Sequence, residues 1–235
     1  MKINSKNLIQ EASSLKNTEK AIIFQRFFKT GKGEYGEGDI FYGLSVPQSK
    51  TIANRFISIP LNEIEALLAS NIHEIRFICL QIMILKYQKS PIERDALYKI
   101  YLKNAVRINN WDLVDCSAYK IAGEHLLNGD RGILYKLARS KNLWEKRISI
   151  ISTFRFIQNK EHRDTLKISE MLLHDEHDLI HKAVGWMLRE VGKKCGRDKE
   201  EIFLKKYYKV MPRTMLRYSL ELFPKELKDF YMGRK

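Results

Sequence analysis

The chain has 235 residues, with 42 Lys or Arg against 28 Asp or Glu, which gives a formal net charge of +14. Its hydrophobic fraction of 44% is typical of a globular protein and excludes a disordered one. The longest apolar stretch, Phe77 to Leu85, falls short of the roughly 20 residues that a membrane span needs, so no membrane partner is expected. A protein this basic usually binds a polyanion such as nucleic acid.

The cysteine and histidine residues indicate neither a disulfide scaffold nor a metal site. The three cysteines lie far apart and form no Cys-x-x-Cys motif: Cys79, Cys116 and Cys195. An N-terminal segment without the apolar core of a secretory signal also favours the cytoplasm. His174, His177 and His181 have helical spacing, but a turn at His177 is expected to separate them, so we predict no metal and no cofactor.

In chain order, the first strong helical signals lie between residues 61 and 91. Apolar residues recur at helical spacing over 61–68, a polar turn follows at 70–71, and a second apolar stripe occupies 75–85. Pro91 is expected to begin another helix, where its missing N–H group is not needed.

Helical signals continue towards the C-terminus. Asp178 is expected to cap a helix over 179–191, with Gly192 just beyond its end. A further helix is expected over 214–223, stopped by Pro224. Because strand-like alternation is nearly absent, the sequence predicts an all-α fold.

One segment cannot be helical, because five of the chain's twelve glycines lie between Gly31 and Gly43. The sequence predicts a Gly-rich loop or a short β-hairpin here. Its aromatic residues either pack back onto the core or form a basic, aromatic finger that touches nucleic acid. In the second case Lys32 and Tyr35 would contact DNA.

Five helical segments share a pattern in which a polar turn is followed by a charged residue and an apolar run. They are HEIRFICLQIM, WDLVDCSAYKI, WEKRISIISTF, IHKAVGWMLRE and TMLRYSLELF. The charged residues at the shared position are Arg76, Asp115, Arg147, Lys182 and Arg217, separated by 39, 32, 35 and 35 residues. This spacing is typical of HEAT-like repeats, which stack into a curved solenoid. We therefore expect one superhelical domain over 1–235, whose concave face carries four cations and one acid.

The three tryptophans all fall within these segments: Trp111, Trp144 and Trp186. Trp111 lies one helical turn before Asp115, so the two share a helix face. Trp144 is better explained as a buried anchor of a turn. If the helices stack side by side, Asp115 lies between Arg147 and the rings of Trp111 and Trp186.

A carboxylate between two indole rings can stabilise developing positive charge by Coulomb attraction and cation–π contact. The flanking cations are expected to keep Asp115 ionised. On a nucleic acid, positive charge develops on the sugar when an N-glycosidic bond is cleaved through an oxocarbenium-like transition state. A purine that already carries a charge needs no general acid to leave, and the cluster has no obvious second carboxylate.

Three segments resemble the signature motifs of the AlkD family of bacterial DNA alkylation repair glycosylases. They are Trp111–Asp115, Asn142–Arg147 and Lys182–Glu190. The resemblance implies a HEAT-like superhelix that excises cationic 3- and 7-alkylated purines from duplex DNA without extruding the base. It further implies that Asp115 is the catalytic carboxylate and that Trp111 and Trp186 contact the deoxyribose.

The resemblance also assigns phosphate contacts. It implies that Arg147 holds the phosphate next to the lesion, and that Arg155 and Arg189 contact the DNA backbone. Two features depart from the family's best-known glycosylases. Phe27 stands where they have a tyrosine, and the 31–43 segment is longer, as in relatives that are thought to bind branched DNA.

Two function classes besides a monofunctional glycosylase stay open: a non-catalytic binder of branched DNA, and a helical-repeat protein scaffold. The predicted partner of a monomeric chain is double-stranded DNA. The residues expected to contact it are Arg76, Arg155, Lys182, Arg189, Arg217, Phe27, Lys32 and Tyr35.

Overall fold

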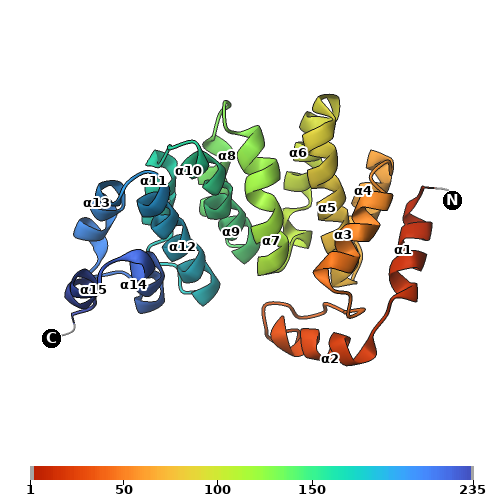
Figure 1. Ribbon diagram of the computed structural model, residues 1–235, viewed down its shortest axis with the longest axis horizontal. Helices are drawn as coiled ribbons and strands as arrows, with labels where there is room; N and C mark the ends of the chain where they lie inside the picture. Colours follow the sequence, from red (N-terminus) through yellow and green to blue (C-terminus); the bar gives the residue numbers. More distant parts are fainter. Residues whose placement is uncertain (1–2, 234–235) are drawn as a thin grey trace. The chain divides into compact units, whose positions relative to one another are not determined.

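The computed structural model describes residues 3–233, which form helices joined by short turns and contain no strand (Figure 1). The all-α prediction is therefore confirmed. The chain divides into two compact units, one up to Ser117 and one from Ala118 onward. Neighbouring helices pair within each unit, as they do in an α–α solenoid. Within the described range, no helix is both long and apolar enough to cross a bilayer.

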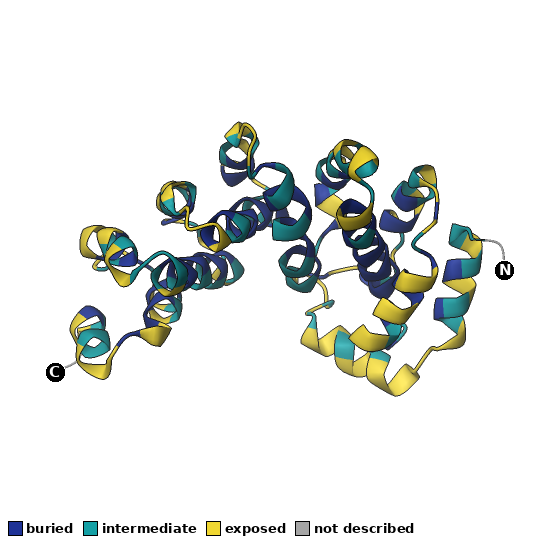
Figure 2. Cartoon of the chain, turned by 45° about the horizontal axis from the view of Figure 1, so that its top comes forward, coloured by how far each residue is buried: buried dark blue, intermediate teal, exposed yellow. Residues whose placement is uncertain are grey.

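The first unit is organised around one buried helix, α5 (His73–Lys89), which packs against α3, α4 and α6. Its other helices are α1 (Ser5–Ser14), α2 (Thr18–Phe27), α3 (Val46–Arg55), α4 (Leu61–Leu68), α6 (Arg94–Lys103) and α7 (Trp111–Ala118), the last of which ends at the unit boundary. Helix α2 contrasts with α5, because none of its residues is buried (Figure 2).

The second unit is organised around α12 (Asp178–Lys194), which packs against α9, α13 and α14. After a π turn at Tyr119–Gly123 come α8 (Gly132–Ala138), α9 (Leu143–Ser152), α10 (Phe154–Gln158), α11 (Arg163–Met171), α13 (Arg197–Tyr207), α14 (Arg213–Ser219) and α15 (Lys225–Met232). Gly185 lets α12 approach α14 closely, because a Cβ atom there would meet the Met215 carbonyl.

The predicted helix bounds are confirmed near α4 and α5 and are wrong at both ends of α12. Pro91 begins a 3-10 turn that leads into α6. The N-cap of α12 is His177, whose Nδ1 accepts from the Leu179 amide, and Asp178 is already the first helical residue. Gly192 lies inside the helix, which continues to Lys194. Its C-cap is Cys195, and Gly196, which follows at a positive φ of 122°, is the N-cap of α13.

The last predicted helix is also shorter than expected, since α14 is followed by a separate 3-10 turn over Leu220–Leu222. Beyond Pro224 the chain forms α15, which the sequence analysis did not predict. That the two units form one domain over 1–235 stays a prediction.

The glycine-rich segment 31–43 is a loop of successive turns, so the loop alternative is correct and the hairpin is not present in this segment. Its end is fixed by Glu74, whose carboxylate accepts the backbone amides of Tyr42, Gly43 and Leu44 at 3.0, 2.7 and 3.1 Å. Phe41 is 5% exposed and packs inward. The interpretation in which the aromatic residues return to the core therefore holds for Phe41.

Candidate functional site

Helix α7 carries Trp111 and Asp115 one turn apart on one face, and both are partly exposed. The Asn110 side chain accepts the Trp111 amide at 2.9 Å and so defines where the helix begins. The Trp111 ring stacks on Phe28 at 5.4 Å and meets Phe27 edge-on at 5.8 Å. Phe27 is 59% exposed, so an accessible aromatic surface adjoins the Trp111 indole.

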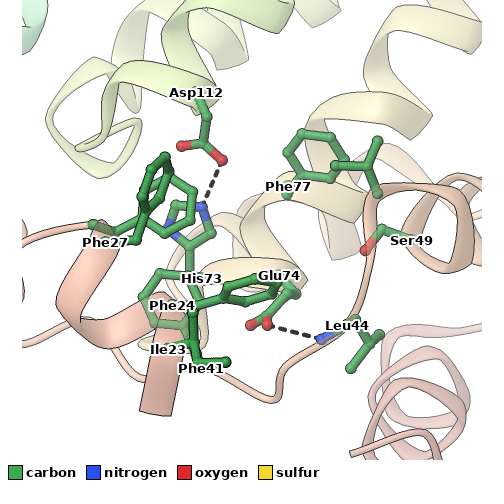
Figure 3. A pocket seen from close by; sticks show the side chains of 12 residues that line it. Ile23, Phe24, Phe27, Phe41, Leu44, Ser49, His73, Glu74, Phe77 and Asp112 are labelled. Carbon is green, nitrogen blue, oxygen red and sulfur yellow. Dashed lines mark hydrogen bonds and ion pairs between the residues drawn. The ribbon is translucent and has the colours of Figure 1, made fainter. Parts of the chain in front are cut away.

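Below these rings the first unit contains an open cavity of about 330 Å³ (Figure 3). Its walls come from α2, the loop that follows, α3 and the first turns of α5 and α7. They are formed by Ile23, Phe24, Phe27, Phe28, Phe41, Leu44, Val46, Ser49, His73, Glu74, Phe77 and Asp112. The polar groups in this lining are few, and Glu74 is already bound to backbone amides. The cavity therefore offers mainly aromatic and aliphatic surface.

Four charged side chains form a network at the edge of this cavity. His73 lies between two carboxylates, with Nδ1 at 3.1 Å from Asp39 and Nε2 at 2.9 Å from Asp112. Arg76 donates from Nη2 to both Asp39 oxygens at 2.8 Å and from Nη1 to the Ser70 carbonyl. The network joins the 31–43 loop to α5 and to the first turn of α7.

The network favours the charged forms of His73 and Asp39. Burial disfavours the charged form of His73, but the charge and hydrogen bond of Asp112 and the bond to Asp39 outweigh it and raise the pKa of His73 to about 9. Burial likewise opposes ionisation of Asp39, yet its bonds to His73 and Arg76 hold the pKa of that carboxyl below its usual value. Two anions thus face two cations.

This network corrects the prediction for Arg76. The residue was expected on an exposed, DNA-facing surface, but it is 2% exposed and ion-paired with Asp39. Because a buried carboxylate needs a cationic or hydrogen-bonding partner, Arg76 serves the interior of the first unit.

In the second unit, Trp186 belongs to a row of three aromatic rings. Its ring lies 6.0 Å from Phe154, which in turn meets Tyr119 edge-on at 5.2 Å. Trp186 is partly exposed and shares the face of α12 with Lys182 and Arg189. The indole predicted to contact the sugar is therefore accessible within its own unit.

Arg147 is also placed differently from the prediction. It was expected to hold a phosphate, but its side chain is buried in α9 and Nη1 donates to the Leu179 carbonyl at 2.5 Å. A guanidinium held in this way bridges α9 and α12 instead of facing solvent. Trp144 is 5% exposed, as expected for a buried anchor.

A family model described as "DNA alkylation repair enzyme" matches residues 8–223. The chain belongs to the DNA alkylation repair family. Among solved structures, one from Enterococcus faecalis described as a predicted DNA alkylation repair enzyme superposes with a TM-score of 0.69 at 20% sequence identity. The match covers 89% of this chain and 97% of that chain, and at this identity it shows a shared fold. No curated protein matches the chain.

The other basic residues expected to contact DNA in this repair-family member are mostly ion-paired at the surface. Arg155 pairs with Glu124, Arg189 with Glu221 and Lys182 with Asp178, the last at 2.7 Å. Arg217 is exposed. Such pairs are weak in water and can exchange a carboxylate for a phosphate.

The 31–43 loop of the repair-family chain is not a strongly basic finger. Lys32 is exposed and Tyr35 partly exposed, as a DNA contact would require. However, the carboxylates of Glu34 and Glu37 accept the amides of Gly31 and Gly33 at 2.8 Å, so acidic side chains accompany the lysine. Among the residues the structure describes, no three His, Cys, Asp or Glu side chains gather as metal ligands.

Sequence reasoning missed two parts of this arrangement. Tyr119 and Phe154 extend the Trp186 ring row, and only their nearness to the repeat motifs could have suggested them. The His73 network was missed because its members lie 34 and 39 residues apart.

Proposed function

We propose that this repair enzyme is a monofunctional DNA glycosylase for cationic alkylated purines, such as 3-methyladenine and 7-methylguanine, in duplex DNA. The observation that carries the proposal is the accessible Trp111–Asp115 pair on α7 in a chain of the DNA alkylation repair family. No metal or cofactor takes part in the proposed reaction.

In the proposed reaction the bond between C1′ of the sugar and the purine nitrogen breaks. The bonding electrons pass to the purine and neutralise its charge, while C1′ becomes oxocarbenium-like. The Asp115 carboxylate stabilises that charge and orients a water molecule, which adds to C1′ and passes a proton to the same carboxylate. Indole faces add a cation–π term, from Trp111 and, in our proposal, Trp186.

The carboxylate next to Trp111 supports a mechanism without a general acid. Asp112 points towards His73 and is bonded to it, as Figure 3 shows. An anion held by an imidazolium is a poor proton donor, so the enzyme does not protonate the leaving purine. The positive charge that the purine already carries must make it a good leaving group. This restricts the proposed substrates to purines that are already cationic.

The cavity beside Trp111 does not favour extrusion of the base. A pocket that reads an extruded base needs hydrogen-bonding groups for its edge. Here the polar lining is limited to four side chains, and those of Glu74, His73 and Asp112 already bond to protein groups. We therefore propose excision with the lesion left in the helical stack, and backbone contacts from Arg155, Lys182, Arg189 and Arg217.

The test is release of 7-methylguanine from methylated duplex DNA by wild type and Asp115→Asn. Loss of one electrostatic stabiliser is expected to slow release by roughly 100-fold or more. Asp95→Asn, an exposed carboxylate on α6, is the matched control and should leave the rate unchanged. A wild-type protein that releases no base would exclude the proposal.

A binder of branched DNA is the second candidate, motivated by the exposed Lys32 and the partly exposed Tyr35 on the loop. It predicts tighter binding to junctions than to linear duplex, reduced by Lys32→Gln. Deleting the loop is unsuitable as a test, because Asp39 and Phe41 are buried parts of the fold. Equal affinity for both DNA shapes would exclude this candidate.

A further inference from the structure

The position of His73 fixes its protonation state by geometry. Each of its ring nitrogens lies within hydrogen-bond distance of a carboxylate, Asp39 on one side and Asp112 on the other. An ionised carboxylate can only accept, so both nitrogens must donate. A neutral imidazole has a single N–H group, and the arrangement therefore requires the imidazolium.

We propose that His73 is a positioning residue for base excision: by holding Asp112 it fixes the first turn of α7, and with it Trp111 and Asp115. This inference rests on the proposed function, which assigns Trp111 and Asp115 to the reacting sugar. His73 is 2% exposed, so in this proposal it acts through Asp112 and not by contact with the substrate.

Two routes connect His73 to Trp111. The first is covalent, because Asp112 is the next residue in the chain and lies in the same helical turn. The second runs through stacked rings: Phe28 lies 5.0 Å from the His73 ring and 5.4 Å from the Trp111 ring. Phe41 also stacks on the His73 ring, with the two ring centroids 4.5 Å apart. A shift of the imidazolium would therefore move both the backbone beside Trp111 and the ring against which its indole rests.

The link to α7 is the more solvent-exposed of the two that His73 makes, and Asp112 has fewer other partners than Asp39. Asp39 also receives bonds from Arg76 and from Asn109, and it is 6% exposed. Asp112 also receives the Leu113 amide at 2.8 Å, and its side chain is 20% exposed. A neutral His73 can donate to one carboxylate only, and Asp112 can turn to water. Loss of the charge is therefore expected to release α7.

The charged groups that act on His73 come from each element packed against it. They are Asp112 on α7, Asp39 in the loop and Arg76 on α5. Phe28, which follows α2, and Phe41 contribute aromatic faces, and a cation over such a face is stabilised. Protonation of His73 is thus coupled to the two carboxylates and opposed by the guanidinium.

The first experiment measures single-turnover release of 7-methylguanine and duplex affinity for His73→Gln. A misplaced catalytic group is expected to slow the single-turnover rate roughly tenfold or more, with duplex affinity changed by less than about twofold. His174→Gln is the matched control, since His174 is exposed and lies in the second unit. An unchanged rate in His73→Gln would overturn the inference.

The second experiment is the pH profile of that rate, corrected for spontaneous depurination. Wild type should lose activity as the pH rises through about 9, where His73 gives up its charge, whereas His73→Gln should lack this alkaline limb. Asp112→Asn removes the main stabilising charge and should move the limb to lower pH. A residue needed only for folding would reduce the folded fraction and leave the profile of the folded protein unchanged.

A third readout needs no catalytic activity. The indole N–H resonance of Trp111 should shift or broaden in His73→Gln, while those of Trp144 and Trp186 in the second unit should stay in place. A shifted Trp111 signal in a protein whose wild type releases no base would support positioning and exclude the glycosylase proposal. A slower rate with an unchanged Trp111 signal and an unchanged pH profile would overturn positioning.

Discussion

The charge on His73 makes the stability of the chain depend on pH in a defined direction. Folding raises the pKa of this imidazole from 6.5 to about 9. Below pH 6.5 the ring is charged in both the folded and the unfolded chain, and its contribution to folding is complete. As the pH rises through 9 the folded chain loses the proton and the contribution disappears.

The magnitude follows from the two pKa values. Because each unit of pKa corresponds to about 1.4 kcal/mol, His73 contributes about 3 kcal/mol to the free energy of unfolding below pH 6.5. Removing one partner from a buried charge pair costs about 3–5 kcal/mol, which is the same order. A contribution of this size to the free energy of unfolding can be distinguished from the smaller contributions of neighbouring surface charges.

The assay is urea unfolding of wild type and His73→Gln across the range from about pH 6 to about pH 10. The stability advantage of wild type over the variant should shrink by about 3 kcal/mol across this range. Other titrating groups contribute to both proteins and cancel in the difference. His174→Gln should track wild type throughout. A difference that stays constant with pH would show that His73 does not carry the charge assigned to it.

Three further predictions concern the second unit. Glu200 is 2% exposed and burial raises its pKa from 4.5 to about 9, so wild-type stability should fall as the pH rises above 4.5. Glu200→Gln should therefore raise the free energy of unfolding at pH 8 by about 5 kcal/mol. The same variant should equal wild type near pH 4.5 in urea unfolding. Gly185→Ala should destabilise the unit by about 1–3 kcal/mol, because the new methyl group meets the Met215 carbonyl and Tyr218, and thermal unfolding would measure this. Arg217→Gln should reduce the slope of log affinity for duplex DNA against log salt by about 0.9 if Arg217 neutralises one phosphate. An unchanged slope would show that Arg217 does not neutralise a phosphate of the DNA.

The sequence predicted those features of the fold that depend on local periodicity. Apolar spacing located α4, which buries one stripe of side chains at intervals of three to four residues. It also located α5, although that helix is buried on nearly all of its faces. The ends of α12 were less predictable. Asp178 and His177 are both able to cap a helix, and the choice between them depends on which side chain reaches the Leu179 amide.

The candidate site was predictable only where its members lie on one helix. Trp111 and Asp115 are one turn apart, so helical geometry alone places them on a common face. His73, Asp39 and Asp112 come from three segments, and no periodicity connects them. Their proximity depends on how α5 packs against its neighbours, which the sequence pattern does not specify.

The charged residues at the shared position of the five repeat segments show that the sequence pattern does not predict which side chains are exposed. Arg76 and Arg147 were assigned to an exposed face because they recur at similar positions near the starts of their helices. Both guanidinium groups instead donate to backbone carbonyls, of Ser70 and Leu179. The Ser70 carbonyl follows the C-terminal end of α4, where carbonyl groups lack helical partners, and Arg76 satisfies it across the turn. The Leu179 carbonyl lies in the first turn of α12, and Arg147 joins α9 to that turn. A charged residue that recurs at the same position of each repeat segment can therefore stabilise the fold of each repeat, and need not bind a common ligand such as DNA. Exposure separates the two explanations, and it leaves Lys182 and Arg217 as the members of this set that are accessible to a phosphate backbone.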